Sequence, residues 1–280
     1  MLVAHGSTVN AQSSAPTKRL ADILSARGVF AQVSTAYNLE TPKIAPALAA
    51  LIAARVARVF VVPITISEGH FTEDTIPQQL GLCRRGQCDC PADECHYARV
   101  QELGGTRVHY CHPIGTHPSM TDVLLGRARE IVQTHPFPHA PEPSQTALFI
   151  AGHGTGKNRR SREAIEAQVE LIRRRGEYAE AHAVFMEEAP FIKDCYAMSA
   201  QRHLVLVPFF IADGLHTVED IPVLLGESPA TVAQRLAAGQ PTWNNPTERH
   251  GKWLWYTRAI GDEPHLPEVI LERVREMAVA

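Results

Sequence analysis

The segment Leu2-Val3-Ala4-His5-Gly6-Ser7 returns later in the chain as Ile150-Ala151-Gly152-His153-Gly154-Thr155, and this repeat decides the fold. His5 and His153 lie 148 positions apart, and the same offset relates Glu40 to Glu188. Two further blocks return in the same order at offsets of 145 and 146. Four blocks in one order at nearly one offset indicate that the 280 residues contain two related halves.

Each half alternates short apolar segments with amphipathic ones. In the first half we expect strands at 2–4, 29–37, 58–66 and 106–110, and helices at 15–27, 42–55, 75–82 and 118–133. In the second half we expect strands near 146–151, 180–186, 203–211 and 252–256. This alternation predicts parallel strands joined by helical crossovers, and runs such as Leu204-Val205-Leu206-Val207 are apolar on both faces, as buried parallel strands are.

The sequence therefore predicts an α/β fold with two similar doubly wound domains. Each domain is expected to have a four-stranded parallel sheet flanked by helices, and the two are expected to be pseudo-twofold related across a cleft. Residues 1–135 form the first domain, with a Cys-rich insertion at 83–97, and residues 146–280 form the second. Between them, 136–145 is rich in proline and is expected to be an extended linker. A polar insertion at 226–251 contains Trp243, a candidate for stacking on a flat ligand.

Composition excludes several classes of protein. Twenty-seven basic and 30 acidic residues give a net charge of -3, which offers no general attraction to nucleic acid or to an anionic membrane. No apolar run approaches the roughly 18 residues of a membrane span, and the first residues already look like a strand and not a leader. We therefore expect a cytoplasmic protein without nucleic-acid or membrane partners.

Histidines lie where ligands bind in parallel open sheets, just beyond the carboxyl ends of strands. His5 and His153 follow the first strand of each half, Glu188 follows the second strand of its half, and His216 follows the third. A single histidine at such a place is more often structural. The pairing of His153 with His216 favours metal or proton chemistry instead.

A basic turn follows His153 at the start of the next predicted helix. Its members are Lys157, Arg159, Arg160 and Arg162. Cations are unfavourable at the positive end of a helix dipole, so this turn indicates an anionic ligand with several carboxylates or phosphates. A solvated basic face balanced by Glu163 and Glu166 is an equally open interpretation.

These motifs resemble the sirohydrochlorin chelatases, which are class II, ATP-independent tetrapyrrole metal chelatases. In that family a His-Gly-Ser or His-Gly-Thr motif follows the first strand, and a G-x-H-x-x-x-D-I-P motif follows the third. The second half matches both, with His153-Gly154-Thr155 and Gly214-Leu215-His216-Thr217-Val218-Glu219-Asp220-Ile221-Pro222. The first half matches the first motif with His5-Gly6-Ser7. It departs from the second, because Gly69-His70-Phe71-Thr72-Glu73-Asp74-Thr75-Ile76-Pro77 has its histidine one place early.

The resemblance implies insertion of Fe2+ or Co2+ into sirohydrochlorin, in sirohaem or cobalamin biosynthesis. It implies that His153 and His216 bind the metal and take protons, with Glu188 as a further catalytic residue and Asp220 orienting or assisting. The metal is then a substrate, and the chemistry requires no cofactor. The substrate-binding residues would be Thr155, Lys157, Arg159, Arg160, Arg162, His5, Glu68 and His70. The first half remains the alternative location of the working pair.

The residue types suit this reaction. Imidazole has an unperturbed pKa of about 6.5, so near neutral pH its nitrogen can bind iron, cobalt or nickel and also accept a proton. A bare carboxylate such as Glu188 or Glu68 could accept the second pyrrole proton. The polycarboxylate substrate would supply the anion that the basic turn indicates. We expect a monomer with an internal pseudo-dimer.

Two rival functions stay open. A non-catalytic carrier of metal or tetrapyrrole on the same fold would bind both without accelerating metallation. A metal-dependent hydrolase or a histidine phosphotransfer enzyme would need an acidic metal site, or a nucleophilic histidine surrounded by arginines.

The cysteines fall into two groups. Cys83, Cys88, Cys90 and Cys95 lie within one short segment and could hold zinc or an iron–sulfur cluster, although their spacing fits no common motif and free thiols are an equal alternative. Cys111 and Cys195 are expected to be buried apolar residues.

Overall fold

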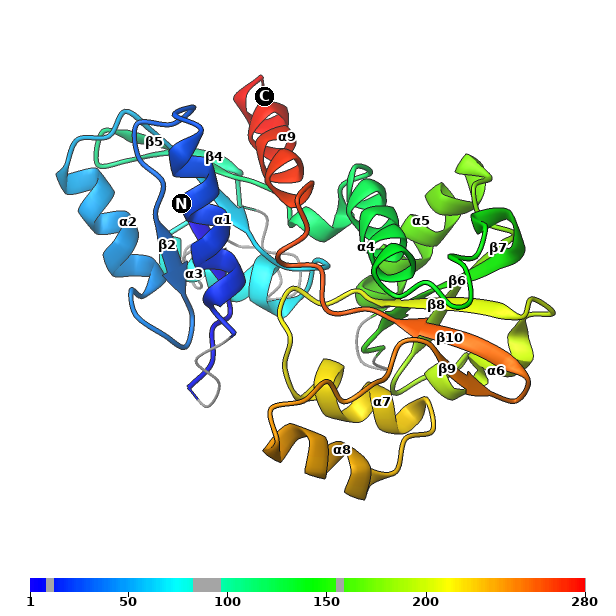
Figure 1. The fold of residues 1–280 in the computed structure, drawn as a ribbon. Coiled ribbons are helices and arrows are strands. Elements are labelled where there is room, and N and C mark those ends of the chain that lie inside the picture. Colours follow the sequence, from blue (N-terminus) through cyan, green and yellow to red (C-terminus); the bar gives the residue numbers. More distant parts are fainter. Residues whose placement is uncertain (9–12, 83–96, 155–158, 280) are drawn as a thin grey trace. The chain divides into compact units, whose positions relative to one another are not determined.

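The computed structural model describes residues 1–8, 13–82, 97–154 and 159–279, in two compact units. Unit 1 consists of Met1–His117 and Leu266–Ala280, and unit 2 consists of Pro118–His265. Each unit contains one five-stranded, mostly parallel sheet with helices packed on its faces (Figure 1). The α/β fold with two similar domains is thereby confirmed.

The sheet of unit 1 has the strand order β2-β1-β3-β5-β4. Its strands are β1 (Leu2–Ala4), β2 (Thr35–Tyr37), β3 (Arg58–Pro63), β4 (Val100–Leu103) and β5 (Thr106–Tyr110). Its helices are α1 (Ala15–Ala26), α2 (Ile44–Ala53), α3 (Ile76–Leu80) and α9 (Leu266–Ala278), with a π-helical turn η1 (Phe71–Thr75) and a 3-10 turn η2 (Ile114–Thr116). Apolar side chains alternate along β1, so that Val3 packs with α2 and α3 while Leu2 lies on the other face.

The sheet of unit 2 has the equivalent order, β7-β6-β8-β10-β9. Its strands are β6 (Thr146–Gly152), β7 (Glu180–Phe185), β8 (His203–Pro208), β9 (Thr247–Arg249) and β10 (Lys252–Tyr256). Its helices are α4 (Met120–Thr134), α5 (Arg159–Arg175), α6 (Cys195–Met198), α7 (Ile221–Leu224) and α8 (Pro229–Ala237), with 3-10 turns η3 (Pro143–Gln145) and η4 (Ile192–Asp194) and a π-helical turn η5 (His216–Asp220). β6 is buried along its whole length, as its unbroken apolar run requires.

The prediction of four strands in each sheet was wrong, because each sheet has a fifth, antiparallel edge strand. β4 pairs with β5, and β9 pairs with β10. Each hairpin closes through two residues with positive φ, Gly104-Gly105 in the first and His250-Gly251 in the second. Such two-residue turns match the right-handed twist of an antiparallel pair. The strand predicted at 29–37 is also shorter, since only Thr35–Tyr37 pairs.

The compact units differ from the domains predicted at 1–135 and 146–280. α4 belongs to the first half of the sequence but packs against α5, β8 and β10 of unit 2. α9 belongs to the second half but packs against α1, β3 and β5 of unit 1 (Figure 1). The proline-rich segment at 136–145 therefore joins α4 to β6 within unit 2 and is not the boundary between the units. The last helix of each sequence half, α4 or α9, thus buries its apolar face on the sheet of the other half. Amphipathic periodicity predicts that such a helix packs on a sheet but does not predict which sheet.

None of the helices in the described part of the chain has the length and apolar character that crossing a bilayer requires.

An ion pair in unit 2 should make stability depend on pH. Arg175 at the end of α5 donates a hydrogen bond to Asp122 in the first turn of α4, and this bond lowers the pKa of Asp122. A carboxyl whose pKa is lower in the folded state stabilises the fold above its ordinary pKa of about 3.9, and this contribution is lost as the pH falls through the folded value. We expect Asp122→Asn to lower the free energy of unfolding by about 0.5 kcal/mol at pH 7. In urea titrations the difference from wild type should shrink near pH 3, and an equal difference at both pH values would contradict this account.

Candidate active site

The structure brings His153 and His216 together at the carboxyl edge of the sheet of unit 2. His153 follows β6, and His216 begins η5 after β8. Their ring centroids are 4.9 Å apart in an edge-to-face arrangement. The side chains are 38% and 48% exposed, so both imidazoles can reach a ligand from solvent. A metal–nitrogen bond of about 2.1 Å would allow both rings to bind one ion.

Hydrogen bonds set the tautomer of both rings. The Nδ1 of His216 lies 2.7 Å from the Oδ2 of Asp220, and the Nδ1 of His153 lies 2.8 Å from the carbonyl oxygen of Gly154. A carbonyl oxygen only accepts, and an ionised carboxylate does the same, so Nδ1 is the donor in both rings. In the neutral imidazoles the lone pair is then on Nε2, the nitrogen that could bind a metal ion.

The glycine of the His-Gly-Thr motif is required by geometry. Gly154 has a φ of +69°, which side chains other than glycine rarely adopt. A Cβ atom there would also lie 2.8 Å from the Cγ of Glu188 and 2.8 Å from the Cβ of Phe185. Gly154 therefore allows the chain to turn beside Glu188 directly after His153.

Glu188 is not the bare carboxylate that the sequence analysis assumed. The Nη1 of Arg162 donates to the Oε2 of Glu188 at 3.2 Å and to the carbonyl oxygen of Ala189 at 2.8 Å. Although burial acts in the opposite direction, hydrogen bonds to Glu166 and Glu188 raise the pKa of Arg162. Glu188 therefore has an arginine partner at the edge of the site.

Glu187, which was not predicted from the sequence, lies beside the imidazole of His153. Its Oε1 is 3.7 Å from the Nε2 of His153, and its side chain is 59% exposed. The repeat at offset 148 draws attention to Glu188, since only that residue aligns with Glu40. Glu187 becomes recognisable only when the turn after β7 is seen beside His153.

The residues of the predicted basic turn have different environments in the structure. Arg159 and Arg160 are exposed at the start of α5, whereas Arg162 binds Glu166 and Glu188. Thr155 and Lys157 lie outside the described residues. Arg162 thus supports Glu188, and its role in substrate binding stays a prediction.

Unit 1 has the same backbone frame but a different pair of side chains. Gly69 and Thr72 exchange the same hydrogen bonds as Gly214 and Thr217, at 2.9 and 3.1 Å in both units. η1 and η5 then align residue by residue, which places Phe71 where unit 2 has His216. His5 accordingly meets the ring of Phe71 at a centroid distance of 4.8 Å. The structure thus forms an imidazole pair in unit 2 and an imidazole–phenyl pair in unit 1.

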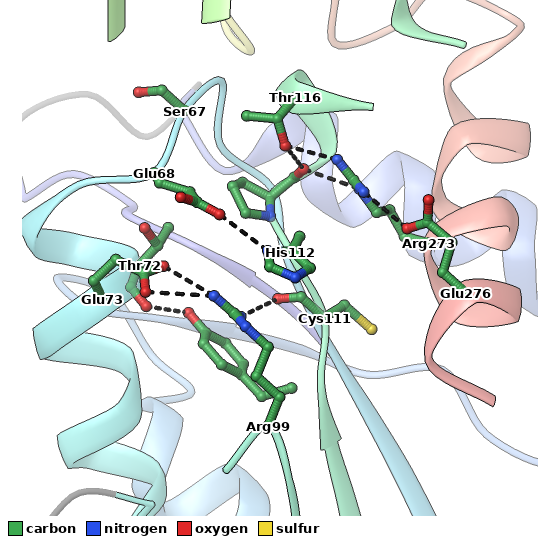
Figure 2. Close-up of polar contacts among 12 residues, drawn as sticks. Ser67, Glu68, Thr72, Glu73, Arg99, Cys111, His112, Thr116, Arg273 and Glu276 are labelled. Atoms are coloured by element: carbon green, nitrogen blue, oxygen red, sulfur yellow. Dashed lines mark hydrogen bonds and ion pairs between the residues drawn. The ribbon is translucent and has the colours of Figure 1, made fainter. Parts of the chain in front are cut away.

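The other predicted residues of unit 1 have carboxylate or imidazole partners. The Nδ1 of His70 lies 3.1 Å from Asp74. Glu68 lies 3.0 Å from the Nδ1 of His112, a residue that the sequence analysis missed (Figure 2). Arginines hold the carbonyl groups on both sides of His112: Arg99 binds that of Cys111 at 3.3 Å, and Arg273 binds that of Pro113 at 3.1 Å. Glu68 is therefore one half of a carboxylate–imidazole pair at the carboxyl edge of this sheet, and not a bare carboxylate.

The substitution of phenylalanine for histidine in unit 1 suggests a gain-of-binding experiment. We expect the double variant Phe71→His, Thr75→Asp to place a second imidazole beside His5, with a carboxylate at the position equivalent to Asp220. Titration with Co2+, followed by its visible absorption, should then show one more binding equivalent than wild type. Phe71→Leu is the matched control and should leave the stoichiometry unchanged. An unchanged stoichiometry in the double variant would contradict the equivalence of Phe71 and His216.

The remaining predicted sites have separate outcomes. Cys83, Cys88, Cys90 and Cys95 lie outside the described residues. Cys111 and Cys195 are buried, as expected, and burial raises the pKa of each thiol to about 12. The stacking role considered for Trp243 was wrong, because Trp243 is only 4% exposed and packs in the core of unit 2. Within the described ranges, no three His, Cys, Asp or Glu side chains gather closely enough to form a metal site by themselves.

Sequence comparisons identify relatives of both halves. A family model, CbiX, matches residues 1–131 and 147–277. A protein named "Probable sirohydrochlorin cobaltochelatase" from Halobacterium salinarum is 34% identical over 279 residues, covering 99% of this chain and 90% of the relative. A sirohydrochlorin cobaltochelatase from Methanopyrus kandleri is 25% identical over 138 residues, covering 46% of this chain and 95% of the relative. Almost all of that second relative corresponds to about half of this chain.

Solved structures share the architecture. DR2241 from Deinococcus radiodurans, a multi-domain protein with structural similarity to chelatases, has a TM-score of 0.70 and 27% identity. The match covers 97% of this chain but only 54% of that protein. SirB from Bacillus subtilis with Fe3+ has a TM-score of 0.69 at 17% identity, with 99% and 94% of the two chains covered. At this identity the second likeness concerns the fold alone.

Proposed function

The chain belongs to the CbiX family, and we propose that it inserts a divalent metal ion, Fe2+ or Co2+, into sirohydrochlorin without ATP. The observation that supports this most directly is the pair formed by His153 and His216, whose centroids are 4.9 Å apart. Both rings use Nδ1 in a hydrogen bond to the protein, so both have Nε2 available for the metal. The names of the relatives support sirohydrochlorin as the substrate, and the paired imidazoles support this location for the site.

Two imidazole ligands suit a metal ion that has to be transferred to the macrocycle. A closed structural site surrounds its ion with four protein ligands, whereas a pair of ligands leaves most coordination positions to water and to the incoming substrate. The macrocycle nitrogens can then replace water first and the imidazoles last. Neutral nitrogen ligands accept iron, cobalt and nickel alike, so the supply of metal contributes to the choice among them.

Metallation releases two pyrrole protons, which need acceptors. Glu187 is a candidate acceptor in unit 2, since it lies 3.7 Å from the Nε2 of His153. Glu188 contributes by position, because Arg162 holds its side chain through a hydrogen bond. In unit 1, Glu68 with His112 is a second candidate acceptor.

The substrate's carboxylates need cationic partners. Arg159 and Arg160 are exposed at the start of α5, close in sequence to His153, and we assign them to this role. The reaction would belong to sirohaem or cobalamin biosynthesis, and we expect it in the cytoplasm. Participation of His5 and His70, a monomeric state and a cleft shared by the two units stay predictions.

The test is an anaerobic absorbance assay with metal-free sirohydrochlorin and Fe2+, Co2+ or Ni2+ in turn. We expect the purified chain to accelerate the spectral change of metallation well above the rate without protein. A carrier on the same fold would bind both metal and macrocycle but leave that rate unchanged. Such a result would contradict the proposed function and favour the carrier.

A further inference from the structure

Leu215, directly before His216, is a large apolar side chain exposed to solvent. It is 68% exposed, and among the large hydrophobic residues of the described ranges only Val279, close to the chain end, exceeds it. Scattered exposed leucines are common in proteins and need no explanation. Leu215 is different because its neighbour is one of the two imidazoles of the candidate site, and because the ring of Phe210 is also near, 6.1 Å from that of His216.

The outward position of Leu215 is built into a rigid turn. The hydroxyl of Thr217 accepts a hydrogen bond from the backbone of Gly214 at 2.9 Å and donates one to its carbonyl at 3.1 Å. The hydroxyl of Tyr256 donates to the carbonyl of Thr217 at 2.6 Å, and Thr217 is only 3% exposed. With both ends of the turn held, Leu215 is fixed toward solvent and does not fold back onto the core.

Unit 1 provides an internal comparison for this position. The same bonds hold Gly69 and Thr72, and the hydroxyl of Tyr110 donates to the carbonyl of Thr72 at 2.6 Å. The residue equivalent to Leu215 is His70, whose side chain is 79% exposed and which pairs with Asp74. The same hydrogen-bonded turn therefore presents a polar side chain, His70, in unit 1 and an apolar one, Leu215, in unit 2. The apolar side chain is the one that precedes a member of the imidazole pair.

We propose that Leu215 packs against the apolar face of the tetrapyrrole and positions the macrocycle over His153 and His216. This inference rests on the proposed function and extends it to substrate recognition. A flat macrocycle bears its carboxylates on the rim and has apolar carbon around its central nitrogens. A metal held by His216 enters at that centre, so the side chain next to His216 meets ring carbon and not carboxylate. Leucine is suited to that contact, and a polar residue there would lose water without gaining a partner.

The test compares Leu215→Ser with Leu215→Met and with Ile23→Ser. Ile23, on α1 of unit 1, is an exposed large apolar residue and serves as the matched control. Burial of one leucine side chain corresponds to about a 10- to 100-fold change in affinity. We expect Leu215→Ser to raise the KM for sirohydrochlorin about tenfold or more, with kcat and Co2+ affinity near wild type. Leu215→Met should restore most of the affinity, and Ile23→Ser should behave as wild type.

Binding of metal-free sirohydrochlorin separates this inference from the proposed function. Its Kd, measured by absorbance titration, should rise in Leu215→Ser by the same factor as KM, with unchanged thermal stability. If wild type binds the macrocycle but does not metallate it, the proposed function fails, and a raised Kd in Leu215→Ser still supports the contact. A Kd equal to that of wild type would overturn the inference whether or not the enzyme turns over. Absence of binding by wild type would overturn both.

Discussion

Replacing His153 or His216 with alanine is expected to lower the metallation rate by at least about 100-fold. Loss of a residue that merely orients a metal ligand typically costs 10- to 100-fold, so loss of the ligand itself should cost more. The two rings meet edge to face with their centroids 4.9 Å apart, and we propose that each offers Nε2 to the same ion. Under this proposal the two rings act as one site, so the double variant should be scarcely slower than either single variant.

The measurement is the anaerobic assay, combined with Co2+ titration of each variant. Both single variants should lose Co2+ affinity as well as rate, while circular dichroism remains unchanged because both side chains are partly exposed. His139→Ala replaces an exposed imidazole of the proline-rich segment and serves as the matched control. His5→Ala tests the alternative location in unit 1. If His5→Ala abolishes turnover and His153→Ala does not, the working site lies in unit 1 and the present assignment is wrong.

Asp220→Asn should lower both Co2+ affinity and rate by about 10- to 100-fold. Asp220 contacts neither the ion nor the macrocycle in this account, so it is a positioning residue that acts through His216. Its Oδ2 lies 2.7 Å from the Nδ1 of His216, which holds the proton on Nδ1 and increases electron density at Nε2. An amide at this place keeps the shape but loses the charge, and its NH2 group can face Nδ1 and favour the wrong tautomer.

A readout besides rate distinguishes positioning from a general structural effect. The visible absorption of bound Co2+ reports its ligand geometry, and we expect Asp220→Asn to change this spectrum and Asp220→Glu to restore part of it. Glu180→Gln is the control, since it removes a carboxylate that lies 2.9 Å from another imidazole, that of His182, at the amino end of β7. Wild-type Co2+ affinity and spectrum in Asp220→Asn would show that His216 needs no carboxylate partner.

Much of the site was predictable because its signals are local and occur twice. His153 and His216 were recognised from their places after predicted strands, and the parallel sheet then brings strand ends to one edge. The departure of the first half was visible as a histidine one place early. The consequence of this departure became clear only from the π-helical turns of the structure. They put Phe71 and not His70 at the position of His216. A shift of one residue in such a turn exchanges the inward and outward side chains.

The pairings of charged residues were harder to predict from the sequence. Arg162 was expected to bind substrate, yet it holds Glu188 across a separation of 26 residues. His112 gave no signal, because it has no histidine counterpart in the second half and becomes notable only when Glu68 lies beside it. Contacts of this kind depend on where loops from different strands end in space, and residue type and spacing carry little information about that.

The sequence by itself determined the duplication, the α/β alternation and the two imidazoles at strand ends, because repeats, periodicity and strand-end positions are properties of neighbouring residues. Tertiary structure alone decided that α4 completes unit 2 and α9 completes unit 1, since an amphipathic helix can bury its apolar face on either sheet. It also decided that the ring of Phe71 meets His5 in unit 1, that Arg162 contacts Glu188 and that Leu215 stays exposed beside His216. The last outcome depends on side-chain direction within a hydrogen-bonded turn, which forms only when Thr217 and Tyr256 meet across the fold.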